Sequence, residues 1–169
     1  RVPLVVVLQN PVAPTVTTPQ QLCSGEGKTL ADLSTATNLK WYTTSTGGTA
    51  LAATTTLQSA TYYASQVVGG CEGTNRTPVV VSVTQTPDKP TVTTEDQCDA
   101  VSTAKINNVK STTEVTTYSF INTATNAVVS PAPTVNRATG EISGLGIGKY
   151  KVTATKDGCD KQSAEFEIK

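Results

Sequence analysis

The sequence predicts an all-β protein made of two tandem β-sandwich domains, and three observations support this. Threonine accounts for 32 of the 169 residues, and Thr together with Val favours half-buried strands over helix. Short runs of alternating polar and apolar residues recur about every 8–12 residues between turn signals. A motif near the start of the chain recurs 76 positions later. We therefore expect two copies of one unit, each with about seven strands.

The composition excludes several classes of function. There are 13 Lys and Arg residues against 13 Asp and Glu residues, so no net positive charge attracts nucleic acid. No run approaches the 18 or so apolar residues that a membrane-spanning helix needs, so we expect no membrane insertion. The chain contains no His, which removes the usual general base and a leading metal ligand. We therefore expect no enzyme activity and no cofactor.

The two copies begin with the same motif. The sequence PTVTT at residues 14–18 recurs at residues 90–94, and each copy is followed shortly by a cysteine, Cys23 or Cys98. Such self-similarity at a fixed spacing is the signature of a repeat architecture.

The copies also match at their far ends. Tyr62 stands nine residues before Cys71, and Tyr150 stands nine residues before Cys159. Between these anchors, the segment around Trp41 aligns without a gap with the segment around Phe120. These two aromatic residues are predicted to fill equivalent core positions.

The repeat sets the predicted domain boundaries. Residues 11–86 form the first repeat and residues 87–169 the second, joined by a short Pro-rich link that restricts their relative motion. Residues 1–10 belong to neither, because RVPLVVV at 1–7 is similar to RTPVVV at 76–81, which closes the first repeat. We interpret residues 1–10 as the closing strand of a preceding repeat or as an extra edge strand. The chain is then a slice of a tandem array.

The alternation of polar and apolar residues, together with the turn residues, predicts where the strands lie. In the second repeat, Phe166 and Ile168 are expected to face inward with Ala164, and in the first Val79, Val81 and Val83 do the same. The Gly47-Gly48 pair and the Asn126-Ala127 pair mark hairpin turns. The predicted strands are 14–19, 28–33, 38–44, 49–52, 55–58, 61–68 and 78–85, followed by 90–95, 104–109, 116–122, 127–130, 134–137, 148–156 and 163–169.

The four cysteines are expected to form two disulfides, which form in an oxidising, extracytoplasmic setting. The chain has no C-x-x-C pair, so a zinc knuckle or redox motif is not indicated. Four cysteines allow three pairings, and the repeat favours one disulfide within each copy, Cys23 with Cys71 and Cys98 with Cys159.

Two stretches carry a resemblance to known families. The first repeat has KWY at 40–42, GGTAL at 47–51, TYYASQ at 61–66 and GCEG at 70–73, and it resembles Ig-like repeats of large surface proteins in Bacteroidota. The second has ISGL at 142–145, GKYKVTAT at 148–155 and DGC at 157–159, and it resembles the repeat of the gliding-motility adhesin SprB and its relatives.

The resemblance implies two tandem Ig-like β-sandwich domains of about seven strands each, with one disulfide per domain. It also implies export by type IX secretion, display on the cell surface, and a structural or adhesive role in attachment or gliding. The expected partners are neighbouring repeats of the same chain and, in addition, surface polysaccharide. Kinship with antibody domains is only architectural, because there a Tyr lies two residues before the second Cys.

Two groups of residues are candidates for ligand binding. If Cys98 pairs with Cys159, five carboxylates converge and could bind Ca²⁺; the alternative is a solvated acidic loop. These five residues are Glu95, Asp96, Asp99, Asp157 and Asp160. Tyr42 and Tyr63, each next to an inward aromatic residue, could form an outward platform for a sugar ring, the alternative being ordinary cross-strand packing.

The platform supports a second hypothesis for function. The chain could be an accessory carbohydrate-binding module of a secreted polysaccharide-degrading enzyme. In that case glycan binding should depend on Tyr42 and Tyr63, whereas a structural repeat should bind no defined glycan.

Overall fold

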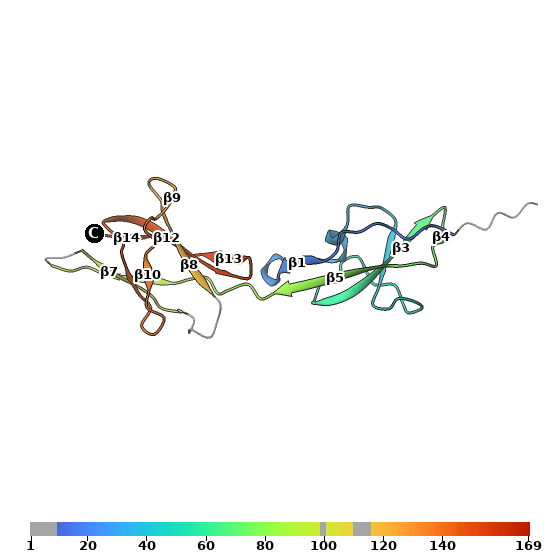
Figure 1. The fold of residues 1–169 in the computed structure, drawn as a ribbon, viewed down its shortest axis with the longest axis horizontal. Helices are drawn as coiled ribbons and strands as arrows, with labels where there is room; N and C mark the ends of the chain where they lie inside the picture. The colour runs from blue at the N-terminus through green and yellow to red at the C-terminus, as the bar shows by residue number, and fades with distance from the viewer. Residues whose placement is uncertain (1–9, 99–100, 110–115) are drawn as a thin grey trace, which may run out of the picture. The chain divides into compact units, whose positions relative to one another are not determined.

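The computed structural model describes residues 10–98, 101–109 and 116–169, and strands dominate this part of the chain (Figure 1). The all-β prediction is confirmed. The chain divides into two compact units with the boundary between Val83 and Thr84. The predicted closing or edge strand at residues 1–10 falls almost wholly outside the described residues.

The first unit contains one five-stranded sheet and two 3-10 helices among its described residues. The sheet order is β1-β5-β3-β2, and β4 also pairs with β3. In chain order the elements are β1 (Gln20–Cys23), η1 (Ser24–Glu26), η2 (Leu30–Leu33), β2 (Leu39–Tyr42), β3 (Ala60–Val68), β4 (Cys71–Glu72) and β5 (Thr77–Thr84).

Four predicted strands of this unit are wrong. The predicted strands 49–52 and 55–58 are reduced to the isolated bridges Trp41–Leu51 and Thr29–Thr56. Residues 30–33 of the predicted strand 28–33 form helix η2, because Thr29 and Asp32 make a reciprocal capping box. The backbone N–H of Thr29 donates to the Asp32 carboxylate at 2.7 Å, which favours a helical turn. Residues 14–19 form no strand before Gln20, since two prolines there lack the N–H that a ladder needs.

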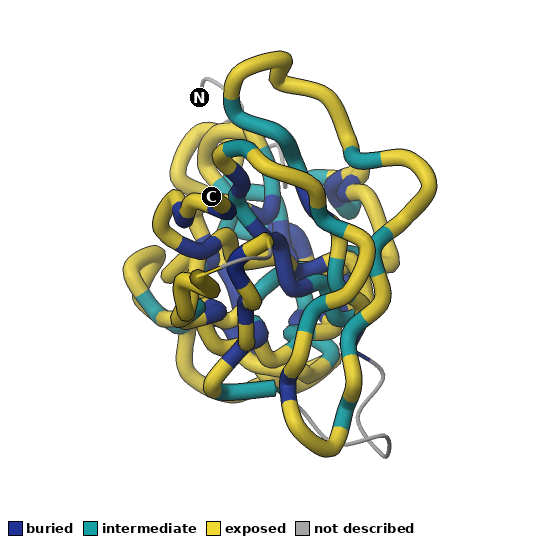
Figure 2. Tube along the Cα trace, turned by 90° about the vertical axis from the view of Figure 1, so that its left-hand side faces the viewer, coloured by how far each residue is buried: buried dark blue, intermediate teal, exposed yellow. Residues whose placement is uncertain are grey.

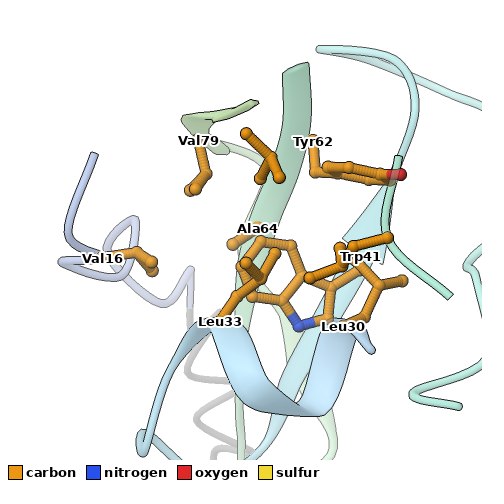
Figure 3. Packing of buried hydrophobic residues seen from close by; sticks show 9 residues of the cluster. Val16, Leu30, Leu33, Trp41, Tyr62, Ala64 and Val79 are labelled. Atoms are coloured by element: carbon orange, nitrogen blue, oxygen red, sulfur yellow. The ribbon is translucent and has the colours of Figure 1, made fainter. Parts of the chain in front are cut away.

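Trp41 lies within the core of the first unit. Figure 3 shows its indole packed beside helix η2 and strand β3, close to Leu30, Leu33 and Tyr62. Val79 and Val81 of β5 are buried as predicted, and Val83 is partly buried against the same cluster. Leu30 is fully buried, so η2 supplies the apolar cover that a second sheet would otherwise provide.

The second unit is a sandwich of two sheets. One sheet has the order β10-β11-β7-β6, and the other has the order β13-β12-β8-β9 with β14 also paired to β12. Strands β11 and β13 were not predicted. The strands are β6 (Val92–Glu95), β7 (Thr103–Ile106), β8 (Thr117–Asn122), β9 (Ala127–Val128), β10 (Thr134–Val135), β11 (Glu141–Ser143), β12 (Gly148–Lys156), β13 (Cys159–Gln162) and β14 (Phe166–Ile168).

The inner faces of this unit follow the predicted alternation with one exception. Phe120, Phe166 and Ile168 are buried, whereas Ala164 is exposed because it precedes β14 rather than belonging to it. Along the trace, short buried stretches alternate with exposed ones (Figure 2).

Both units are organised around a nine-residue strand, β3 or β12. One edge of β3 pairs with β2, and the other edge pairs first with β5 and then with β4. One edge of β12 pairs with β8, and the other pairs first with β14 and then with β13. The same arrangement in both units supports the repeat inferred from sequence.

A tyrosine anchors the start of each nine-residue strand. Tyr62 and Tyr150 are both third in their strand, and both are buried. The Tyr62 hydroxyl accepts from the backbone N–H of Gln58 at 3.1 Å, and the Tyr150 hydroxyl donates to the carbonyl of Gly146 at 3.1 Å. Each bond reaches four residues upstream, as in the tyrosine corner of Ig-type sandwiches.

We predict that Tyr62→Phe lowers the free energy of unfolding of the first unit by about 0.5–1.5 kcal/mol, because the Gln58 N–H loses its acceptor. Urea denaturation followed through the fluorescence of Trp41, the only tryptophan, measures this effect. Tyr63→Phe is the matched control, and its change should stay within about 0.5 kcal/mol. Equal effects of the two substitutions would contradict the anchoring role of Tyr62.

Candidate functional site

The densest group of charged and polar side chains among the described residues surrounds Glu72 on the outer face of the first sheet. Its Oε2 accepts from Lys40 Nζ at 2.8 Å. Its Oε1 accepts from the hydroxyls of Tyr42 and Ser65, each at 2.6 Å. Ser65 is fully buried and Tyr42 is only 5% exposed. We call Lys40, Tyr42, Ser65, Glu72 and Arg76 the Glu72 cluster.

Strand register explains why these residues meet. Lys40 lies opposite Ser65 and Tyr42 lies opposite Tyr63, so all four share one face of the β2–β3 pair. The β3–β4 hairpin turns at Gly69 and Gly70, both with positive φ, which glycine adopts without strain. This turn carries Glu72 back over Ser65.

The hydrogen bonds hold Glu72 in its ionised form. The bond from Lys40, followed by those from Ser65 and Tyr42, lowers the pKa of Glu72 to about 2. Burial, assisted by the bond to Glu72, raises the pKa of Tyr42. The contact with Glu72 also raises the pKa of Lys40. Both shifts keep the donors protonated, so the cluster is a closed ion-pair and hydrogen-bond network.

Arg76 covers the ring of Tyr42. Its guanidinium carbon lies 3.3 Å from the ring centroid, in the range of a cation–π interaction. The same guanidinium donates to the carbonyls of Thr44 and Gly47, each at 2.8 Å. Arg76 therefore ties the hairpin at Gly47 to the outer face of the sheet.

The predicted exposure of Tyr42 is wrong, because the residue is buried beneath Arg76. The structure does bring Tyr42 and Tyr63 together as directly opposed residues, but only Tyr63 retains partial exposure. Sequence reasoning identified Tyr42 and missed Glu72, Lys40, Ser65 and Arg76. The sequence feature that could have revealed this cluster is the alternation of Lys40 and Tyr42, two polar residues that fall on the same face of one strand.

The predicted disulfide pairing is also wrong. Cys23 and Cys159 are disulfide-bonded, whereas Cys71 and Cys98 are free and exposed. Neither Cys23 with Cys71 nor Cys98 with Cys159 can therefore be a pair, and the expected disulfide within each domain is absent from both units.

The predicted convergence of carboxylates fails as well. Asp96 accepts from Ser102 and Lys169 at 3.0 and 3.1 Å, which places Glu95 and Asp96 near the end of β14. Asp157 and Asp160 lie in the β12–β13 hairpin, at the opposite end of the nine-residue strand β12, roughly 27 Å away by strand rise. Asp99 is outside the described residues, and the described part contains no cluster suited to a metal ion.

An open hollow of about 490 Å³ is lined by residues of 15–22 and 32–35. Its one carboxylate, Asp32, already caps Thr29.

Residues 11–84 match the family described as Ig-like domain, CHU_C associated, so the first unit is similar to Ig domains of the Bacteroidota type. No curated protein matches the chain. Ig-like domains are typically non-catalytic.

Two solved structures show weak overall similarity. A chain in the crystal structure of the mouse coronavirus receptor-binding domain complexed with its murine receptor is 9% identical, covering 78% of this chain and 84% of that one, with a TM-score of 0.41. Murine CEACAM1b is 10% identical, covering 91% and 96% respectively, with a TM-score of 0.40.

The location of the protein follows from its cysteine chemistry. A disulfide-bearing Ig-like domain indicates an extracellular or secreted protein, because disulfides persist in oxidising compartments. None of the helices in the described ranges has the length and apolar character to span a bilayer.

We predict that Glu72→Gln lowers the free energy of unfolding at pH 7 by about 1–2 kcal/mol, since three donors lose a charged acceptor. The value allows for solvent screening of a side chain that is 26% exposed. The pKa of Glu72 is depressed in the folded state, so its stabilising effect is full above about pH 5 and is lost as the pH falls toward 2.

Denaturation of both forms across this pH range checks the prediction. Glu165→Gln is the matched control, because the exposed Glu165–Lys149 pair at 3.8 Å should contribute little. A stability difference between wild type and Glu72→Gln that does not shrink on acidification would contradict the ionic role of Glu72.

Proposed function

We propose that the chain is a structural and adhesive repeat segment of a large secreted cell-surface adhesin, without catalytic activity. The observation that carries the proposal is the closed Glu72 cluster. Its donors and acceptors bond one another, and the ring of Tyr42 is covered by Arg76. The polar side chains that would make an active site or a ligand platform here instead fasten a hairpin to a sheet.

The repeated architecture supports the same proposal. Each unit is built on a tyrosine-anchored strand of nine residues, which supports the interpretation of the chain as two copies of one module. Modules in series suit a protein that must extend from a surface, because length increases by adding copies. Neighbouring repeats of the same parent chain are the proposed partners.

The finer assignment rests on sequence similarity. Residues 11–84 match an Ig-like family of the Bacteroidota type, and the second repeat resembles repeats of gliding-motility adhesins. We therefore propose cell-surface display after type IX secretion, with a role in attachment or gliding.

One observation keeps glycan binding as a second candidate. Tyr63 is half-buried and lies opposite the exposed Pro78, and Val80 on the same strand face is 48% exposed. A partly open aromatic ring beside exposed apolar residues can stack on a sugar. This surface would suit an accessory module of a polysaccharide-degrading enzyme.

Binding to a panel of soluble and insoluble polysaccharides separates the two candidates. We predict no saturable binding by wild type, and no difference between wild type and Tyr63→Ala. Tyr42→Phe is the matched control, because it keeps the covered ring and removes only the bond to Glu72. Saturable binding that Tyr63→Ala abolishes and Tyr42→Phe preserves would overturn the structural role in favour of glycan recognition.

A structural repeat segment is expected to resist unfolding. We predict that the oxidised chain withstands a broad-specificity protease under native conditions and is cleaved faster after reduction, because the disulfide restrains the unfolded chain. Equal cleavage rates before and after reduction would contradict this.

A further inference from the structure

The cysteines fall into two kinds by their place in the repeat. Cys23 and Cys98 each follow a PTVTT motif, and we call them loop cysteines. Cys71 and Cys159 each begin the short strand after the nine-residue strand, and we call them hairpin cysteines. One cysteine of each kind is disulfide-bonded, Cys23 and Cys159. One of each kind is free and exposed, Cys98 and Cys71.

A hairpin cysteine lies at the end of its unit where the preceding segment of the chain enters. We call this the leading end. Cys71 lies opposite Val68 in the β3–β4 hairpin. The segment that enters the first unit is held beside this hairpin by Asn10. The Asn10 carboxamide accepts from the backbone N–H of Thr74 at 2.9 Å and donates to the Thr74 hydroxyl at 3.1 Å. A Cβ on Gly73 would lie 2.3 Å from the Pro11 carbonyl oxygen, so the two backbones are in close contact.

Loop cysteines lie at the other end, where the closing strand finishes, which we call the trailing end. In the second unit, Asp96 bonds Lys169, the residue after β14, at 3.1 Å, and Cys98 is two residues further on. In the first unit, Cys23 and Val83 line the same small hollow, and Val83 is near the end of β5. Each unit thus presents a cysteine at each end.

The leading end of the first unit also exposes apolar surface. Val12 is 82% exposed and Val68 is 50% exposed. They line an open hollow of about 390 Å³ with Asn10, Pro11 and Gln66. Exposed apolar side chains grouped around a groove mark an interaction surface.

The sequence before this surface indicates what covers it. RVPLVVV at residues 1–7 matches the closing-strand sequence RTPVVV at 76–81. Closing-strand sequence therefore leads directly into Asn10 and Pro11. We therefore expect the trailing end of a preceding repeat to cover the surface of Val12 and Val68. That end carries a loop cysteine.

We propose that Cys71 and Cys98 are half-sites of disulfides between successive repeats of the parent chain, an inference that rests on the proposed function. Cys71 bonds the loop cysteine of the repeat before it, and the patch of Val12 and Val68 packs on that repeat. Cys98 bonds the hairpin cysteine of the repeat after it. Each junction in the array is then stapled covalently.

Each proposed disulfide forms by thiol–disulfide exchange. Two thiols lose two protons and two electrons and form one S–S bond. A disulfide oxidant accepts them and is reduced to two thiols. Oxidised glutathione serves as this oxidant in the test: one thiolate is first glutathionylated, and the second then displaces reduced glutathione.

Two copies of this chain can imitate a junction, because one supplies Cys98 and the other Cys71. Cys71→Ser and Cys98→Ser variants are incubated with oxidised glutathione, separately and mixed, and linked peptides are identified by mass spectrometry. We predict that the Cys98–Cys71 dimer of the mixture exceeds either homotypic dimer on the order of ten-fold, which corresponds to about 1.4 kcal/mol of docking preference.

Val68→Lys, made in the Cys98→Ser variant, tests the patch. It should lower the mixed dimer several-fold while leaving the rate of Cys71 glutathionylation unchanged. Mixed and homotypic dimers in equal yield, or no mixed dimer, would overturn the proposal. Either of these two results refutes the inter-repeat disulfides only, and the proposed structural role stands. Glycan binding that depends on Tyr63 would instead refute the proposed structural role.

Discussion

Pairing along one nine-residue strand organises each unit of this protein. Strand β3 pairs with β2 on one edge and with both β5 and β4 on the other, and β12 does the same with β8, β14 and β13. A single strand therefore fixes the register of three others. Because side chains alternate with a period of two, this register also decides which residues enter the core.

The buried tyrosine near the start of this strand sets its position along the chain. Its hydroxyl bonds the backbone four residues upstream in both units, and its ring packs in the core. In the first unit, Glu72 fastens the opposite end of the strand through Lys40, Tyr42 and Ser65. Polar side chains are thus used to hold strands together, which agrees with a structural role.

Local patterns predicted much of this organisation. Trp41, Phe120 and Tyr62 are buried as predicted, because alternation and aligned aromatic residues report directly on a core face. The pattern did not reveal helix η2, where a capping box between Thr29 and Asp32 overrides strand propensity. It also missed β13, whose residues are mostly polar and exposed.

Contacts between distant segments could not be predicted in the same way. The predicted pairing within each copy was wrong, because the local sequence around a cysteine does not report which distant cysteine it bonds. The predicted Ca²⁺ site depended on that choice, and it failed when Asp96 and Asp157 proved to lie at opposite ends of β12. The Glu72 cluster depends on a hairpin turning back over β3, which strand periodicity does not report.

If the chain consists of two copies of one module, each unit should fold on its own. Separate expression of residues 10–84 and 85–169, each with its cysteines replaced by serine, tests this. We expect each fragment to unfold cooperatively in urea and to show the near-ultraviolet circular dichroism of packed aromatic residues. Fragments that show no cooperative transition when separate, and regain one only when joined, would contradict it.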